Sequence, residues 1–160
     1  MARTFGIKDG LVPSDFLHAA LDHITAAQAL FTTNPSHYDS AGYLAHVGVE
    51  LLLKAWLLEA AGQFEGIHSL QTLYTQLTQK HQAPKLEAQQ TAVLRMLDQF
   101  EQLRYPNPKQ PTEVGDSDWN DIELLVGALC RAMPTAIPEA IEKAKFGRKG
   151  GRVLMQKKVE

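Results

Sequence analysis

Apolar side chains recur along most of this chain at the three- and four-residue spacing that marks one face of an α-helix. Between residues 42 and 61 the pattern changes, because almost every side chain there is apolar. A helix that is apolar all the way round must be buried on most of its sides. We therefore expect residues 36–62 to form a central helix that the rest of the chain surrounds.

The same spacing predicts helices before and after this central one. Each starts close to a Ser, Asp or Pro that suits the first turn of a helix, and prolines end the first, the fourth and the fifth. The predicted segments are residues 14–35, a third helix capped by Ser69 and running past Leu77, residues 84–104, residues 117–134 and a short piece from Pro138.

No segment alternates apolar and polar residues over a useful length, so no strand is expected. The pattern predicts an all-α fold, an antiparallel up-and-down bundle of four main helices plus a fifth. A short C-terminal helical piece and a basic tail follow the fifth helix. We expect residues 1–142 to form the bundle and residues 143–160 to be the tail.

Charge divides the chain at the same place. Residues 143–160 contain seven basic residues and one acidic residue, a net charge of +6, and the preceding residues contain nine basic and seventeen acidic ones, a net charge of −8. A basic tail of this kind can contact RNA or a protein partner. It can also be a solvated chain end that folds back on its own acidic body.

Composition narrows the class of protein. The only cysteine, Cys130, excludes an internal disulfide, and no group of Cys and His has the spacing of a metal site, so neither metal nor cofactor is expected. The central helix has Glu50 and Lys54 near its middle, which disfavours a membrane span. The N-terminus lacks the apolar core of a secretory signal. We expect a cytoplasmic protein.

His46, Glu50 and Lys54 interrupt the central helix at intervals of four residues and therefore share one narrow stripe. An isolated buried charge costs several kcal/mol, so a buried Glu50 needs a partner. Lys54 is one turn away on the same helix. Arg104, at the end of the fourth helix, is a second candidate because a guanidinium can clamp a carboxylate.

Three runs of sequence carry a resemblance to a known family. Residues 43–57, Tyr-Leu-Ala-His-Val-Gly-Val-Glu-Leu-Leu-Leu-Lys-Ala-Trp-Leu, resemble the second helix of HEPN domains. Residues 66–70, Gly-Ile-His-Ser-Leu, with Leu73, are similar to the family's entry to its third helix. Residues 104–106, Arg-Tyr-Pro, are similar to the end of its fourth helix. The three runs follow one another in the family's order.

The resemblance implies a helical bundle, often a dimer, in prokaryotic proteins. Many members partner a nucleotidyltransferase in toxin–antitoxin or defence modules, and many others are metal-independent ribonucleases. The ribonucleases carry an Arg, a polar residue, four to six further residues and then a His. Here no His follows an Arg by six to eight positions, since the Arg are at 3, 95, 104, 131, 148 and 152 and the His at 18, 23, 37, 46, 68 and 81.

Two classes of function are consistent with these observations. The first is a non-catalytic, dimeric module that binds a partner protein, such as a nucleotidyltransferase, or a nucleotide-like ligand, and that has no catalytic residues. Its candidate polar cleft consists of His46, Glu50, Lys54, His68, Arg104 and Tyr105. The alternative is a HEPN-type ribonuclease toxin with a non-standard site, using His46 or His68 with Arg104, or an RNA-binding protein that uses the basic tail.

The fifth helix is apolar over a wider arc than one packed face requires. Beyond its main stripe it has Leu124, Leu125 and Ala128 on a second flank. Either residues 138–146 of the same chain or a second copy must cover this surplus. A symmetric dimer is the commonest solution, so we expect a homodimer that involves this helix.

Overall fold

The apolar run at residues 42–61 forms the buried centre of the molecule, as its pattern predicts. The computed structural model describes residues 2–81 and 83–139. In chain order its elements are β1 (Thr4–Gly6), the 3-10 turn η1 (Ile7–Asp9), α1 (Pro13–Thr33), η2 (Pro35–His37), α2 (Tyr38–Ala61), β2 (Gln63–Glu65), α3 (Leu70–Lys80), α4 (Ala88–Gln99), η3 (Phe100–Arg104) and α5 (Asp118–Ala132).

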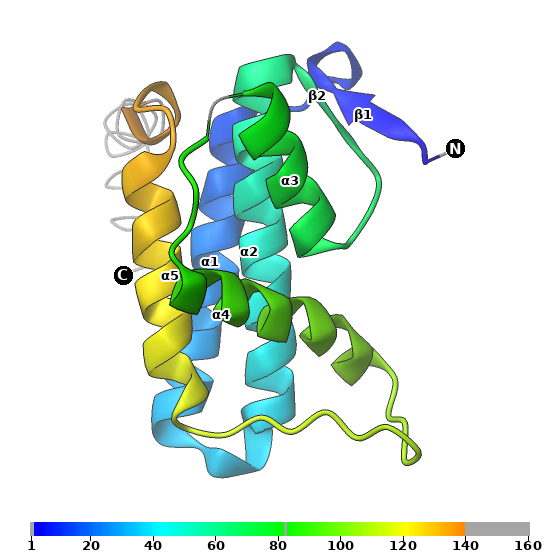
Figure 1. The fold of residues 1–160 in the computed structure, drawn as a ribbon, viewed down its shortest axis with the longest axis vertical. Coiled ribbons are helices and arrows are strands. Elements are labelled where there is room, and N and C mark those ends of the chain that lie inside the picture. The colour runs from blue at the N-terminus through cyan, green and yellow to red at the C-terminus, as the bar shows by residue number, and fades with distance from the viewer. Residues whose placement is uncertain (1, 82, 140–160) are drawn as a thin grey trace, which may run out of the picture.

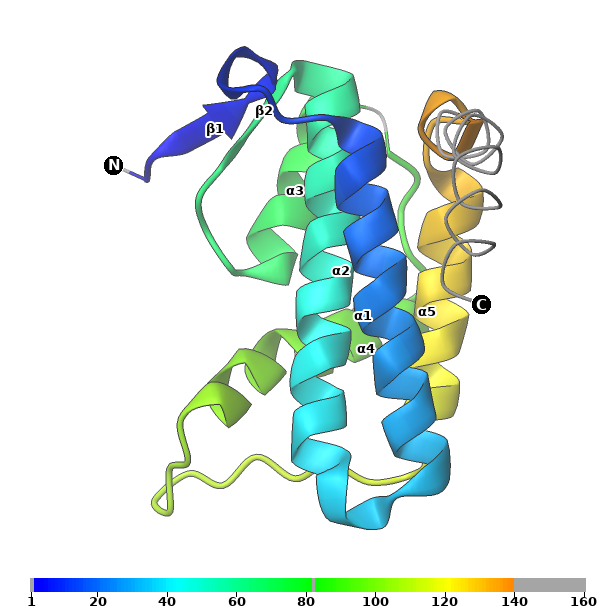
Figure 2. The ribbon, with the colours of Figure 1, turned by 180° about the vertical axis from the view of Figure 1, so that it is seen from behind.

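Helix α2 packs against α1, α3 and α4. It forms a long antiparallel pair with α1, α3 packs along its upper half, and α4 runs obliquely across it (Figure 1). Seen from behind, α5 lies on the far side of α1 from α2 (Figure 2). Leu52, Leu53, Ala55 and Leu58 of α2 have no solvent exposure. The all-α bundle predicted from the sequence is therefore confirmed.

Two short strands were not predicted. β1 and β2 pair antiparallel, with Phe5 opposite Phe64, and this small sheet joins the N-terminus to the end of α2. Phe64 packs on the rings of Phe5 and Phe16, whose centroids lie 6.0 and 5.3 Å away. The expectation of no strands was wrong because three-residue strands are too short to show an alternating pattern.

Helix boundaries differ from prediction at two starts. α1 begins at Pro13 with Val12 in the N-cap position, so Ser14 lies inside the first turn. α4 begins at Ala88 rather than Pro84, because the hydroxyl of Tyr74 donates a hydrogen bond to the Pro84 carbonyl and accepts one from the Leu86 amide. These two bonds hold the segment before α4 against α3.

Other boundaries agree with the sequence. Ser69 caps α3 by accepting a hydrogen bond from the Thr72 amide. The fourth helical segment ends at Arg104 through η3, and α5 starts after Ser117. Residues 136–139 are helical, but the rest of the predicted sixth piece, the 142/143 boundary and the basic tail lie outside the described residues.

Residues Pro35–Ala61 are long and apolar enough to cross a membrane by composition alone. However, 78% of the most apolar stretch of this segment is buried inside the fold. The other helices around α2 account for this burial, as in the core helix of a soluble domain. The segment is therefore weak evidence of a membrane span.

Gly48 sets the distance between α1 and α2. A Cβ at this position would lie 2.6 Å from Cγ1 of Ile24 and 3.2 Å from the carbonyl oxygen of Ala20. The absence of a side chain therefore allows the two helix backbones to approach closely. Both contacting groups belong to the buried face of α1, so neither can move away without disturbing the core.

The Gly48→Ala variant should lower the free energy of unfolding by about 1–3 kcal/mol, because steric strain in a packed core outweighs the better helix propensity of alanine. Gly127→Ala in α5 is the matched control. Its Cβ would meet only the flexible end of Arg131, at 3.2 Å, so stability should be unchanged or rise by up to about 1 kcal/mol. Urea unfolding of both variants checks this, and equal effects would contradict it.

Candidate functional site

The polar stripe of α2 forms a buried charge cluster around Glu50. Glu50 is 8% exposed and Lys54 is 6% exposed. The ammonium of Lys54 donates a hydrogen bond to Oε1 of Glu50 at 2.5 Å, and it lies 5.1 Å from the centre of the Phe64 ring. The expectation that Glu50 is buried and paired with Lys54 is therefore confirmed. A buried ion pair of this kind is costly to break, because removing one partner leaves the other charge unpaired.

His46 joins the cluster to α4. Its Nδ1 donates a hydrogen bond to the Leu97 carbonyl at 2.8 Å, and its Nε2 lies 3.6 Å from Oε2 of Glu50. Since Nδ1 must carry a proton to reach the carbonyl, a neutral ring would present the bare Nε2 lone pair to a carboxylate. A protonated ring instead places a positive charge opposite the carboxylate, in an ion pair that is too long for a hydrogen bond. Leu97 also lies in the last turn of α4, where a positive charge is favoured.

The charge of His46 follows from these contacts. Burial by itself would lower the pKa of His46, but its interaction with the Glu50 carboxylate and its bond to the Leu97 carbonyl together raise it above 6.5. Burial by itself would raise the pKa of Glu50, but His46, Lys54 and His68 lower it from 4.5 to about 2. The carboxylate is thus held ionised at neutral pH and is not available as a proton donor.

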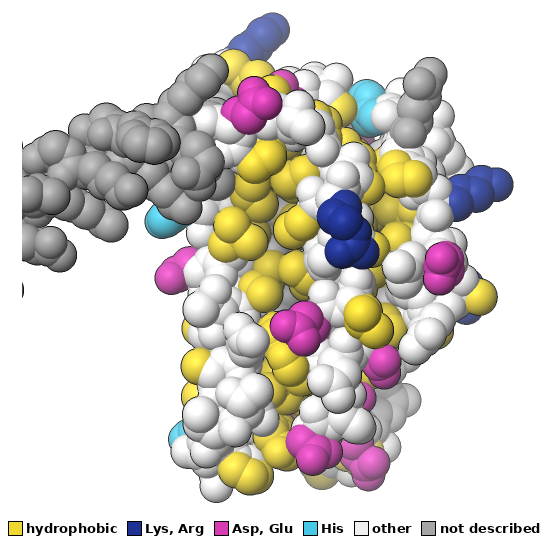
Figure 3. Space-filling model, turned by 90° about the vertical axis from the view of Figure 1, so that its left-hand side faces the viewer, with side chains coloured by type: hydrophobic (Ala, Val, Ile, Leu, Met, Phe, Trp, Pro, Cys, Tyr) yellow, Lys and Arg dark blue, Asp and Glu magenta, His cyan; other side chains and the backbone are white. Residues whose placement is uncertain are grey.

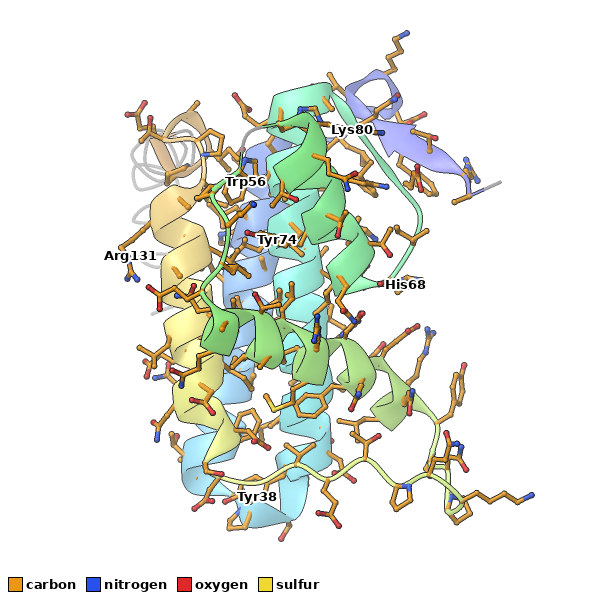
Figure 4. The ribbon with its side chains drawn as sticks, viewed as in Figure 1. Tyr38, Trp56, His68, Tyr74, Lys80 and Arg131 are labelled. Carbon is orange, nitrogen blue, oxygen red and sulfur yellow. The ribbon has the colours of Figure 1, made fainter. Side chains whose placement is uncertain are left out.

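His68 approaches Glu50 from a different part of the chain. It lies in the loop between β2 and α3, at the lower end of α3 (Figure 4). Its Nδ1 is 3.1 Å from both carboxylate oxygens of Glu50. Its side chain is 55% exposed, whereas that of Glu50 is only 10% exposed. His68 is therefore the member of the cluster that solvent can reach.

Asp98 ties the neighbouring residues to the same structure. Its carboxylate accepts hydrogen bonds from the Leu70 amide at 2.7 Å, the Ser69 hydroxyl at 3.1 Å and the Gln71 amide group at 3.0 Å. A carboxylate at the start of α3 also complements the positive end of the helix dipole. Asp98 follows Leu97, the partner of His46, and Ser69 follows His68, the partner of Glu50. The contacts of Asp98 and Glu50 therefore form a closed ring through α2, α4 and the loop before α3.

Arg104 and Tyr105 lie apart from this ring. Arg104 is exposed at the end of η3, and its guanidinium lies 5.6 Å from the centre of the Tyr105 ring, which is 72% exposed. Among the described residues, the ion pairs of Glu50 are with Lys54, His46 and His68, so the expected clamp by Arg104 is not formed. Four of the six candidate residues are thus brought together, and two are not.

Sequence reasoning missed Asp98 and the Leu97 carbonyl. Both follow from the packing of α4 across α2, which no local pattern specifies. One signal for Asp98 was available in the sequence. Its carboxylate lies between Leu97 and Gln99, on the half-buried flank of a predicted helix. The described residues contain no group of three or more His, Cys, Asp or Glu that could hold a metal ion.

Comparison with models of protein families gives a match to the HEPN domain over residues 14–125, more than half of the chain. The matched region includes every element from α1 through η3 and the first half of α5. The family suggested by the three sequence runs is therefore confirmed. Comparisons with curated proteins and with solved structures found no match.

The cluster predicts a stability optimum in mildly acidic solution. Glu50, with its lowered pKa, contributes stability above pH 4.5 that is lost as the pH falls towards 2. His46, with its raised pKa, contributes stability below pH 6.5 that is lost as the pH rises through its folded value. The free energy of unfolding, measured with urea, should therefore peak between pH 4.5 and 6.5, with an acid loss of about 3 kcal/mol from Glu50.

Glu50→Gln is the control variant for this profile. It should be less stable than the parent by about 3 kcal/mol at pH 5.5, since it leaves buried positive groups without their anion. It should also flatten both sides of the profile, because the shift of His46 depends on Glu50. A variant with an unchanged profile would show that the pH dependence arises elsewhere.

Proposed function

Because the chain belongs to the HEPN domain family, we propose that it is a non-catalytic interaction module that binds a partner protein and pairs with a second copy of itself. In finer terms, the partner is a protein such as the nucleotidyltransferase of a prokaryotic toxin–antitoxin or defence system, and the complex works in the cytoplasm. Binding, rather than cleavage of RNA, is the activity that this proposal assigns to the chain.

The main support for a non-catalytic function is that the candidate catalytic groups are engaged with other groups of the same chain. RNA cleavage by acid–base chemistry needs a proton-transfer group and a phosphate-binding cation that reach the same phosphate. His46, Glu50 and Lys54 are buried and paired with one another. His68 is reached by solvent, but its Nδ1 is engaged with the Glu50 carboxylate at 3.1 Å. Arg104 is exposed and has its ring contact with Tyr105 instead.

The surface of α5 supports the dimer. Leu124 is 61% exposed, whereas the neighbouring Leu125 is fully buried within the chain. Leu124 lies beside a hollow of about 160 Å³ between α4 and α5, whose rim includes Glu87, Asp121 and Arg131. Hydrophobic side chains run along this side of the molecule (Figure 3). An exposed leucine among apolar and oppositely charged groups is typical of a contact between proteins.

The purified protein should leave RNA uncleaved, at a rate no higher than that of an Arg104→Ala/His46→Ala variant. Gel analysis of end-labelled single-stranded RNA after hours of incubation checks this, with a single Arg104→Ala variant to exclude effects of misfolding at the buried His46. Cleavage by the parent that is lost in both variants would overturn the non-catalytic proposal.

The chain should behave as a dimer in solution. Light scattering at micromolar concentration should give about twice the chain mass of 17.7 kDa. Leu124→Glu should shift the protein to the monomer, because a buried unpaired charge at an interface costs several kcal/mol.

Ile7→Glu is the matched control for the dimer. Ile7 is also exposed, at 54%, but begins η1, directly after β1 and away from α5. This variant should remain dimeric. A parent that is already monomeric, or a dimer that survives Leu124→Glu, would reject α5 as the interface.

A further inference from the structure

A second hollow lies between α3 and α4; its lining includes Gln71, which donates to Asp98, but none of the residues that pair with Glu50. Its volume is about 320 Å³, at the lower end of the range of small-molecule pockets. One wall comes from α3 with Tyr74, Thr75 and Thr78, and the other from α4 with Thr91 and Leu94. Tyr74 points from α3 towards the segment that leads into α4 (Figure 4). We call this hollow the α3–α4 groove.

Positive charge distinguishes the α3–α4 groove from other hollows. Its lining contains Lys85 and Arg95 and no Asp or Glu. Three other hollows formed by described residues each contain at least one carboxylate, namely Glu87 and Asp121, Asp39, and Glu113. On a body with nine basic and seventeen acidic residues before position 143, two cations without a nearby lining carboxylate favour an anionic ligand. A guanidinium and an ammonium together suit a phosphate group.

The threonines define a second requirement. The hydroxyl of Thr75 donates to the Gln71 carbonyl at 2.7 Å, and that of Thr91 donates to the Glu87 carbonyl at 3.0 Å. The hydroxyl of Thr78 donates to the Thr75 carbonyl at 3.0 Å. Since each hydroxyl proton is already used by the main chain, these lining oxygens are left with the capacity to accept a hydrogen bond. A fitting ligand must therefore bring its own donors, as the hydroxyls of a sugar do.

The apolar part of the groove is held in place before any ligand binds. Leu94 is 2% exposed and anchored in the core, and Leu86 packs against the core from the segment before α4. Tyr74 fixes that segment through its bonds to the Pro84 carbonyl and the Leu86 amide. Leu86 and Tyr74, supported from beneath by Leu94, therefore offer a rigid apolar surface to the C–H face of a ring.

We propose that the α3–α4 groove binds a phosphorylated sugar. Lys85 and Arg95 hold its phosphate, the threonine oxygens accept from its hydroxyls, and Leu86 and Tyr74 contact its ring. The groove shares no residue with the α5 surface or with the cluster around Glu50, so this inference is independent of the proposed partner binding.

Isothermal titration calorimetry of the full chain with glucose 6-phosphate and ribose 5-phosphate tests the inference, with glucose and inorganic phosphate as the two half-ligands. At least one sugar phosphate should bind saturably, and both half-ligands should bind more weakly. Arg95→Gln and Lys85→Gln should each weaken that binding by about tenfold, the loss of one charge-assisted hydrogen bond. Lys80→Gln, which removes an exposed cation of α3 outside the groove lining, should leave it unchanged.

Thr91→Val separates sugar recognition from phosphate recognition. It should weaken the binding of the sugar phosphate severalfold and leave the binding of inorganic phosphate unchanged. Circular dichroism of each variant confirms that these surface changes leave the fold intact. The proposal is overturned if neither sugar phosphate binds saturably, if Arg95→Gln and Lys85→Gln bind as the parent does, or if inorganic phosphate alone binds as tightly as the sugar phosphates.

Discussion

A carboxylate in the middle of an apolar helix must be neutralised where it lies, because little of it is open to water. Glu50 is that carboxylate, and the groups that neutralise it come from two directions. Lys54 and His46 lie one turn away on α2, and His68 arrives from the loop before α3. The position of that loop is therefore tied to the charge of Glu50. Ser69, the next residue, binds Asp98 of α4, and Leu97 of α4 binds His46. One buried charge thus orients two elements outside its own helix, the loop before α3 and the helix α4.

The sequence predicts this arrangement in part. The four-residue spacing of His46, Glu50 and Lys54 specifies that they share one side of α2, and the need to pair a buried charge predicts the bond from Lys54. Ser69 is recognisable as a helix cap from its place before an apolar stripe. Neither argument locates Asp98 or separates Arg104 from Glu50, because both depend on the oblique direction in which α4 crosses α2. The two strands escape prediction for a different reason, since their pairing joins residues about sixty positions apart.

Membership of the HEPN family and the geometry of the cluster bear on function in different ways. The family contains ribonucleases as well as binding modules, so membership leaves the question open. The polar residues that make the second helix recognisable here are engaged with one another, and this favours a structural role for them. The resemblance of residues 43–57 to the second helix of HEPN domains can therefore reflect a shared way of stabilising the helical bundle. Residues on the exposed side of α5 and in the α3–α4 groove are free of this structural role. They are therefore the places where the binding specificity of this chain can differ from that of other HEPN domains.

The pairing of β1 with β2 has a consequence for the order in which the chain folds. α1 and α2 are neighbours in sequence and can associate through local contacts. Phe5 and Phe64, in contrast, are separated in sequence by both of these helices. Closing so long a loop is entropically costly until the helix pair has brought its ends together. β1 therefore docks late, and Phe64, which covers Lys54, gains its stacking partner only at that stage. During synthesis the residues of β1 are thus made before both helices and yet are among the last to reach their final place.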